Sequence, residues 1–252
     1  MASRTLQDER DAHVHLQSFP EAMLPEVMAR ARAAGVVRFG CCGTSPADWD
    51  RVIAIASSEP GVEPSCGLHP WHSADPAVPE DWLERLEALL AAHPGLGVGE
   101  IGLDALRPDP QAQMRAFAAQ LALAARGNRG VVLHCVRAHG EMAAALRPVA
   151  KSLPSILLHA ASCSPEIWRE YERLGACVSL GPAVLNPRAT RVRELARIVP
   201  EDRLLFETDS PDMAVNGCAV SALGGRNAPE NLPRIIAEVR RLRQTEYMKS
   251  NP

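Results

Sequence analysis

The chain has 252 residues, of which 46% are hydrophobic and 23% charged, a composition that excludes disordered and fibrous proteins. A formal net charge of −3 excludes a general basic surface that attracts nucleic acid or an anionic membrane. The seven cysteines include no C-x-x-C pair, which favours a reducing cytosol, and the sequence shows neither a signal peptide nor a membrane-spanning apolar stretch. We therefore expect a soluble, cytoplasmic protein.

Short apolar runs alternate with longer helical patterns along the whole chain. Strands are expected at 11–16, 36–42, 62–69, 97–103, 130–136, 155–161, 176–182 and 203–209. Between them, segments such as 20–35, 45–59, 79–93 and 111–127 repeat apolar residues every three or four positions, as amphipathic helices do. Eight such units predict a single α/β domain, a (β/α)8 TIM barrel, over residues 11–252, preceded by a polar tail at residues 1–10.

Ligand-type side chains lie near the carboxyl ends of six of the expected strands. They are His13 and His15, His69, Glu100 and Asp104, His134, His159, and Glu207 and Asp209. In DAHVHL, residues two apart share one face of a strand, so that His13 and His15 project together. A barrel carries its active site at this end, and imidazole and carboxylate groups bind divalent metals. The pattern predicts a metal centre with the ligands His13, His15, Glu100, His134, His159 and Asp209.

The sequence also resembles the TatD family of metal-dependent hydrolases. The motifs DAHVHL, CGLHPWH, GVGEIGLD, VVLHCVRAHG, ILLHAASCSPE, LLFETDSPDM and GGRNAP follow one another in the order typical of that family, from about residue 11 to residue 240. GEIGLD followed later by ETDSP is the most specific part of the series. The resemblance implies an amidohydrolase-like TIM barrel that cleaves phosphodiester bonds, a deoxyribonuclease of the 3′–5′ exonuclease kind.

The resemblance further implies two divalent ions, which would be Mg, Mn or Zn. It assigns His13 and His15 to the first ion with Asp209 completing that site, His134 and His159 to the second, and Glu100 to both as a bridge. Two ions lower the pKa of a shared water and polarise the bond that it attacks. Asp209 is expected to take the proton of that water and deliver it to the leaving group.

Other residues are expected to assist the reaction. His69 would contact the scissile phosphate, and Glu207 would orient a ligand from the same strand face as Asp209. Asp11 and Asp104 would accept hydrogen bonds from ligand histidines or from the backbone. Trp71 would stack on a base or shield the mouth of the barrel.

The chain departs from the family pattern at three places. Residues 159–164 read HAASCS where relatives resemble HxFSGS, so that Ala161 and Cys163 would alter the wall beside the second ion. Arg137 stands one position later than the arginine common in relatives, and it turns toward an anion only if its strand ends at residue 136. The tail reads Asn251-Pro252 in place of an asparagine followed by a Leu-Phe pair.

Several neighbouring residues are expected to have ordinary structural roles. His72, His93 and His139 fall in loops or at helix starts, where we expect solvated or capping side chains. Strand alternation directs Cys135 away from His134, toward packing.

Two alternatives to a nuclease stay open at this point. The first is a D-aminoacyl-tRNA deacylase or another amide or ester hydrolase, which the acidic net charge mildly favours. The second is a barrel with reduced catalysis that serves as a binding protein or scaffold. On the leading interpretation nucleic acid is a substrate, no membrane is bound, and the protein is a monomer or a small homo-oligomer.

Overall fold

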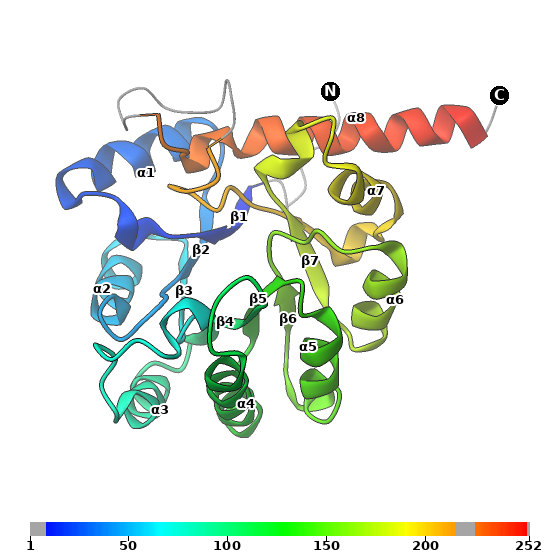
Figure 1. Ribbon diagram of the computed structural model, residues 1–252. Helices are drawn as coiled ribbons and strands as arrows, with labels where there is room; N and C mark the ends of the chain where they lie inside the picture. Colours follow the sequence, from blue (N-terminus) through cyan, green and yellow to red (C-terminus); the bar gives the residue numbers. More distant parts are fainter. Residues whose placement is uncertain (1–8, 215–224, 251–252) are drawn as a thin grey trace. The chain divides into compact units, whose positions relative to one another are not determined.

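The computed structural model describes residues 9–214 and 225–250, and in this part of the chain eight strands alternate with eight α-helices (Figure 1). The strands are β1 (Arg10–Val14), β2 (Arg38–Cys42), β3 (Val62–Cys66), β4 (Gly97–Asp104), β5 (Val131–Val136), β6 (Ile156–Leu158), β7 (Cys177–Leu180) and β8 (Leu204–Phe206). They follow one another in chain order in one eight-stranded sheet. This order and alternation confirm the predicted (β/α)8 fold class.

The helices lie where the apolar periodicity places them. They are α1 (Leu24–Ala33), α2 (Trp49–Ser58), α3 (Trp82–Ala92), α4 (Pro110–Arg126), α5 (His139–Leu146), α6 (Pro165–Arg173), α7 (Thr190–Ile198) and α8 (Leu232–Ser250). None of these described helices has both the length and the apolar character that crossing a bilayer requires. Most of the expected polar tail, residues 1–8, and the final Asn251-Pro252 lie outside the described residues, so those predictions stay predictions.

Several strands are shorter than predicted. β1, β3, β6 and β8 end at residues 14, 66, 158 and 206, whereas the apolar runs suggested ends at 16, 69, 161 and 209. The runs mislead because the first loop residues are buried as deeply as the strands: Leu16, Leu68 and Ala161 are all buried. His15, His69, His159, Glu207 and Asp209 therefore lie in the loops that follow the strands.

The contacts within the chain divide it into two compact units. The first unit comprises Met1–Gly40, Ala160–Trp168 and Val178–Pro252. In it β7 and β8 pair in parallel, with Val178 opposite Leu204. The chain beyond β8 then bonds to the end of β1: Asp209 N donates to His13 O at 3.0 Å, and His15 N donates to Ser210 O at 2.8 Å. The end of the first strand and the segment after the last are thus neighbours.

The second unit comprises Cys41–His159 and Arg169–Cys177 and contains β3 to β6. The register of β4 and β5 sets Gly102 beside His134. Gly102 has φ +151°, and a Cβ atom at this position would collide with the carbonyl oxygen of His134. The glycine of the GEIGLD motif therefore lets β4 approach β5 closely, next to two of the predicted ligands.

Candidate metal centre

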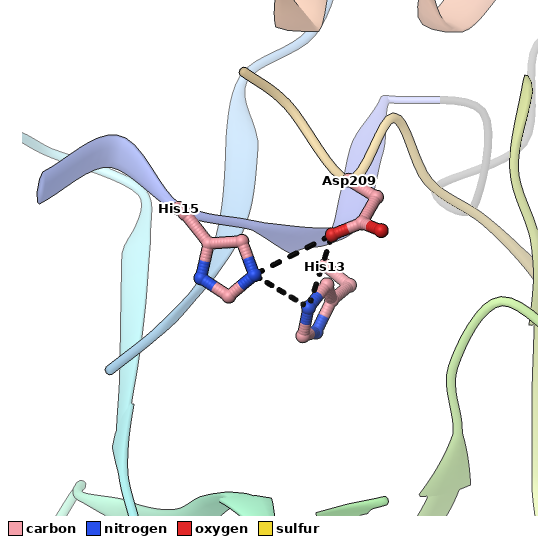
Figure 2. A group of neighbouring side chains, drawn as sticks. All are labelled: His13, His15 and Asp209. Carbon is pink, nitrogen blue, oxygen red and sulfur yellow. Dashed lines mark hydrogen bonds and ion pairs between the residues drawn. The ribbon is translucent and has the colours of Figure 1, made fainter. Parts of the chain in front are cut away.

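The first cluster of ligand-type side chains consists of His13, His15 and Asp209, which point toward one another in Figure 2. His13 Nε2 lies 3.2 Å from His15 Nε2, and each of these nitrogens lies 3.4 Å from Asp209 Oδ1. His13 is fully buried, and the other two side chains are only slightly exposed. Three ligand atoms thus converge at the end of β1.

The backbone builds this first cluster. His13 lies on β1, and His15 directly follows the last residue of that strand. The Nε2 atoms of the two rings nevertheless meet, as the HxH spacing predicts. Asp209 has φ 52°, in the left-handed region that aspartate tolerates better than most residues. Its N–H bonds to His13 O, so that a local turn directs the carboxylate at both histidines.

A buried polar network supports the loop that carries Asp209. Asp11 Oδ1 accepts from Thr208 N at 2.9 Å, and Asp11 Oδ2 accepts from Thr208 Oγ1 at 2.5 Å. Asn227, from the GGRNAP motif, donates from Nδ2 to Thr208 O at 2.7 Å. Burial raises the pKa of Asp11 to about 8, although the bonds from Thr208 act in the opposite direction. Asp11 thus holds the backbone between β8 and Asp209.

The second cluster consists of His69, Glu100, His134 and His159. Glu100 Oε1 lies 3.1 Å from His69 Nε2, 2.9 Å from His134 Nδ1 and 2.7 Å from His159 Nε2. Glu100 is buried in the middle of β4, whereas His134 lies on β5 and His159 directly follows β6. The histidines come from β3, β5 and β6 or the residues just after them, and they meet at one carboxylate oxygen.

His69 belongs to this cluster, although the sequence placed it apart from the ligand set. It precedes a short 3₁₀ helix, Pro70–His72, and its Nδ1 accepts from Trp71 N at 3.2 Å. Nδ1 is therefore the unprotonated nitrogen of the neutral ring, and Nε2 donates toward Glu100. Burial lowers the pKa of His69 to about 4, against the raising effect of Glu100, so that the ring is neutral near pH 7.

Asp104, the last residue of β4, contacts both His134 and the exposed Trp71. Its Oδ2 accepts from Trp71 Nε1 at 2.8 Å and lies 3.4 Å from His134 Nε2, while Oδ1 accepts from Leu106 N at 2.9 Å. Burial alone would raise the pKa of Asp104, but these hydrogen bonds and His134 hold it below its ordinary value. Asp104 stays an anion that fixes both His134 and Trp71.

Two glutamines of α4, which the sequence analysis did not single out, hold the loops of the second cluster. Gln120 accepts from Leu68 N at 2.7 Å and donates to Leu68 O at 3.2 Å. Gln113 accepts from Asp104 N at 2.8 Å and donates to Asp104 O at 3.1 Å. Both side chains are buried. The signal that could have revealed them is two polar residues seven positions apart on one apolar helix face.

The carboxylate of Glu207 accepts a hydrogen bond from the backbone next to His159 and not from the ring of a predicted ligand. It lies beyond the end of β8, so the predicted shared strand face with Asp209 is wrong. Its Oε1 accepts from Ala160 N at 2.7 Å, and its Oε2 accepts from the Ser179 hydroxyl. Ala160 directly follows His159 and has φ 43°, so Glu207 fixes a strained turn next to a ligand.

The remaining predicted residues lie as follows. Arg137 is exposed and follows β5, which ends at Val136, so the condition for turning toward an anion is met.

The expectation that His139 is solvated or capping is wrong, because its Nδ1 lies 3.2 Å from Cys135 Sγ and 3.3 Å from Tyr171 Oη. These contacts place Cys135 in packing, and burial raises the pKa of its thiol to about 11.

The donor sets fit divalent metal ions. Two ligands about 2.0–2.1 Å from one ion at the tetrahedral angle are about 3.3–3.4 Å apart. The three separations of 3.2, 3.4 and 3.4 Å in the first cluster agree with that spacing. Within the second unit, His69, Glu100 and His134 also bring one ligand atom each within 4.8 Å of the others. Imidazole nitrogens with a carboxylate oxygen suit Zn, Mn or Fe better than Ca.

Comparison with known proteins identifies the family. A family model described as TatD related DNase matches residues 10–250. The 3′-5′ ssDNA/RNA exonuclease TatD of Klebsiella pneumoniae (strain 342) is 35% identical over 232 residues, 89% of this chain and 87% of that protein. The uncharacterized metal-dependent hydrolase YjjV of Escherichia coli (strain K12) is 32% identical over 244 residues, 93% of this chain and 90% of its own.

Solved structures agree with the sequence relatives. The crystal structure of YjjV, a TatD homolog from Escherichia coli K12, superposes with a TM-score of 0.84 at 31% identity over 94% of this chain and 91% of that one. A TatD family hydrolase from Entamoeba histolytica gives a TM-score of 0.82 at 16% identity, over 93% and 91% of the two chains, and shows the fold alone. The chain therefore belongs to the TatD-related DNase family and is a metal-dependent hydrolase of the TatD type.

Proposed function

We propose that this hydrolase removes nucleotides from the 3′ end of single-stranded nucleic acid and uses two divalent ions, Mg, Mn or Zn. The observation that carries the proposal is the similarity, over 89% of the chain, to a relative named as a 3′-5′ ssDNA/RNA exonuclease. Two groups of ligand-type side chains that each lie within one compact unit, His13, His15 and Asp209 in the first and His69, Glu100 and His134 in the second, support the use of two ions. In this proposal His13, His15 and Asp209 hold one ion, and Glu100, His134 and His159 hold the other.

The residues of the chain divide the chemistry among them. When bound, the ions would lower the pKa of water and polarise a phosphoryl oxygen, so that the water attacks the phosphorus atom more readily. Asp209 takes the proton of the attacking water and passes it to the leaving oxygen. The contact of His69 with the scissile phosphate stays a prediction. The bridging role of Glu100 also stays a prediction.

Metal analysis of the purified protein tests the two clusters separately. We expect about two ions per chain, with His15→Ala losing one and His134→Ala losing the other. His93→Ala is the matched control, because His93 lies at the end of α3 and belongs to neither cluster. A wild-type protein that binds no divalent metal, or a control that loses as much as the two variants, contradicts the proposal.

Activity is tested with single-stranded DNA and RNA labelled at the 5′ end. Loss of nucleotides from the 3′ end produces a ladder of shortened labelled products, and Asp209→Asn should slow it by about 10²- to 10⁴-fold. A D-aminoacyl-tRNA and a small amide are assayed in parallel with the same ions. Hydrolysis of either of these without trimming of nucleic acid overturns the proposed substrate.

We also propose that the protein acts in the cytoplasm. The six cysteines in the described part of the chain are free thiols, and four of them are buried. Free thiols are the usual state in a reducing compartment. Fractionation of cells followed by immunodetection tests this proposal, and recovery from an oxidising compartment would refute it.

A further inference from the structure

Trp71 is unusual among the described tryptophans because its ring is exposed and yet fixed. It is 52% exposed, whereas Trp49 and Trp168 are buried. Its indole N–H donates to Asp104 Oδ2 at 2.8 Å, and the His69 ring meets it edge-on at a centroid distance of 5.0 Å. A tryptophan that only seals a core would bury its ring. This ring is held at one edge, and about half of the residue is open to solvent.

Arg107 lies against the same ring. Its guanidinium carbon is 4.1 Å from the centroid of Trp71, in the geometry of a cation–π contact. Within the described residues no carboxylate forms an ion pair with Arg107. The loops after β3 and β4 thus present a planar cation that lies over the face of a planar aromatic group.

The position of Trp71 links this pair to the second cluster. The centroid of its ring is 6.1 Å from that of His134, and Asp104 bonds to both side chains. A group stacked on Trp71 would therefore lie about one nucleotide from bond cleavage at that cluster. Aromatic rings stack on unpaired bases, and an arginine guanidinium can stack on a base and also bind a phosphate.

We propose that Trp71 and Arg107 form a stacking platform for the base of the nucleotide next to the scissile phosphate. The inference rests on the proposed function and deepens it, because it gives a physical reason for acting on single strands. A base inside a duplex has both faces covered by its neighbours, so it cannot stack on Trp71 unless it is first unstacked. The platform therefore selects a strand end whose last bases are unpaired.

Oligonucleotides that lack bases test the platform directly. A single-stranded oligonucleotide is compared with one that carries abasic nucleotides at its last two 3′ positions. For the normal strand, Trp71→Ala should raise KM by about 5- to 150-fold, because one stacked base is lost. For the abasic strand the same change should leave KM unaltered. Arg107→Ala should raise KM for the normal strand by a smaller factor.

Two further variants separate a platform from a structural role. Trp71→Phe keeps an aromatic face but loses the bond to Asp104, and it should restore most of the affinity. Arg115→Ala removes an exposed arginine from α4 and should leave KM unchanged, because Arg115 does not contact the ring. Thermal unfolding of each variant shows whether it is folded; if Trp71→Ala is not, Arg107→Ala and Trp71→Phe carry the test.

Binding without turnover distinguishes failure of the platform from failure of the proposed function. In an Asp209→Asn background, fluorescence anisotropy measures the Kd of labelled normal and abasic strands. The platform is supported if the abasic strand has a higher Kd than the normal strand and if Trp71→Ala abolishes this difference. This result would support the platform even if no exonuclease activity is found. Trimming by the wild type with equal KM and Kd for both strands overturns the platform and leaves the proposed function standing.

Discussion

The two clusters of ligand-type side chains are built in different ways. In the first cluster the backbone sets the geometry, because Asp209 N bonds to His13 O and the Thr208 peptide is fastened by Asp11. In the second cluster side chains from outside the strands set the geometry. Gln120 holds the peptide before His69, and Gln113 holds Asp104.

This difference follows from where the ligands originate. Three ligands on two adjacent chain segments need only a correct register between those segments. In the second cluster Glu100 and His134 lie on strands, whereas His69 lies in a loop that must itself be fixed. Two buried amides of α4, two turns apart, hold this loop and the end of β4. We therefore expect the first cluster to lose its metal when Asp11 no longer holds the loop that carries Asp209. We expect the second cluster to lose its metal when the two amides of α4 are removed.

Asp11→Ala should have the largest effect. The change leaves the N–H and the hydroxyl of Thr208 without their buried acceptor, and we expect a loss of about 3 kcal/mol in the free energy of unfolding. Urea unfolding of the metal-free protein measures this loss, and metal analysis should show the first cluster emptied while the second still binds. Asp48→Ala is the matched control, because Asp48 accepts from Thr44 and Ser45 in a half-buried loop of the second unit. Equal loss from both clusters would break the comparison.

Gln120→Leu tests the second cluster and should have a smaller effect. The leucine fills a similar volume but leaves Leu68 N and O unpaired, which we expect to cost about 2 kcal/mol in the free energy of unfolding. Because the loop of His69 is then released, metal binding at the second cluster should weaken more than at the first. Gln111→Leu, an exposed position on the same helix, is the control and should change neither quantity. A variant as stable and as metal-rich as wild type would show that the amide does not position the loop.

The sequence predicted the fold and the ligand types because both leave periodic signals. Eight apolar runs with helices between them specify a (β/α)8 order, and ligand-type residues stand out where valine and leucine are the rule. DAHVHL shows this well, since the spacing of two places both histidines of the first cluster together. Strand ends leave a weaker signal: LLFETD continues a buried run past Phe206, although the backbone has left the strand by Glu207.

Sequence reasoning could not find the contacts that depend on three-dimensional placement. Nothing in QAQMRAFAAQ shows that Gln113 and Gln120 bond to peptides nine and 52 residues away. The sequence predicts that His69 contacts the substrate, and nothing in GLHPWH shows that the turn after β3 brings its ring to Glu100. The partners of Trp71 likewise come from the loop after β4, which no local pattern links to it.

One ion pair in each unit allows a last comparison, and we expect the smallest effect on stability from these pairs. In the first unit Glu238 accepts from Arg241 Nε at 2.8 Å and from Arg193 Nη1 at 2.6 Å. The bonds from Arg241, followed by those from Arg193, lower the pKa of Glu238 to about 2 although burial opposes them. A carboxyl whose pKa is lower in the folded state stabilises the protein above its unfolded pKa of about 4.5, and that contribution is lost as the pH falls toward 2.

Glu238→Gln should therefore lower the free energy of unfolding at pH 7 by about 1 kcal/mol after solvent screening, and the gap to wild type should close between about pH 4.5 and 2. Urea unfolding of the metal-free proteins across this range measures the gap. The matched change in the second unit is Glu170→Gln, whose partner Arg147 is 63% exposed, so its effect should be a few tenths of a kcal/mol at most. If the difference in free energy of unfolding between wild type and Glu238→Gln stays constant from pH 7 to pH 2, the amide alters packing. A loss of the carboxylate charge would instead make this difference depend on pH.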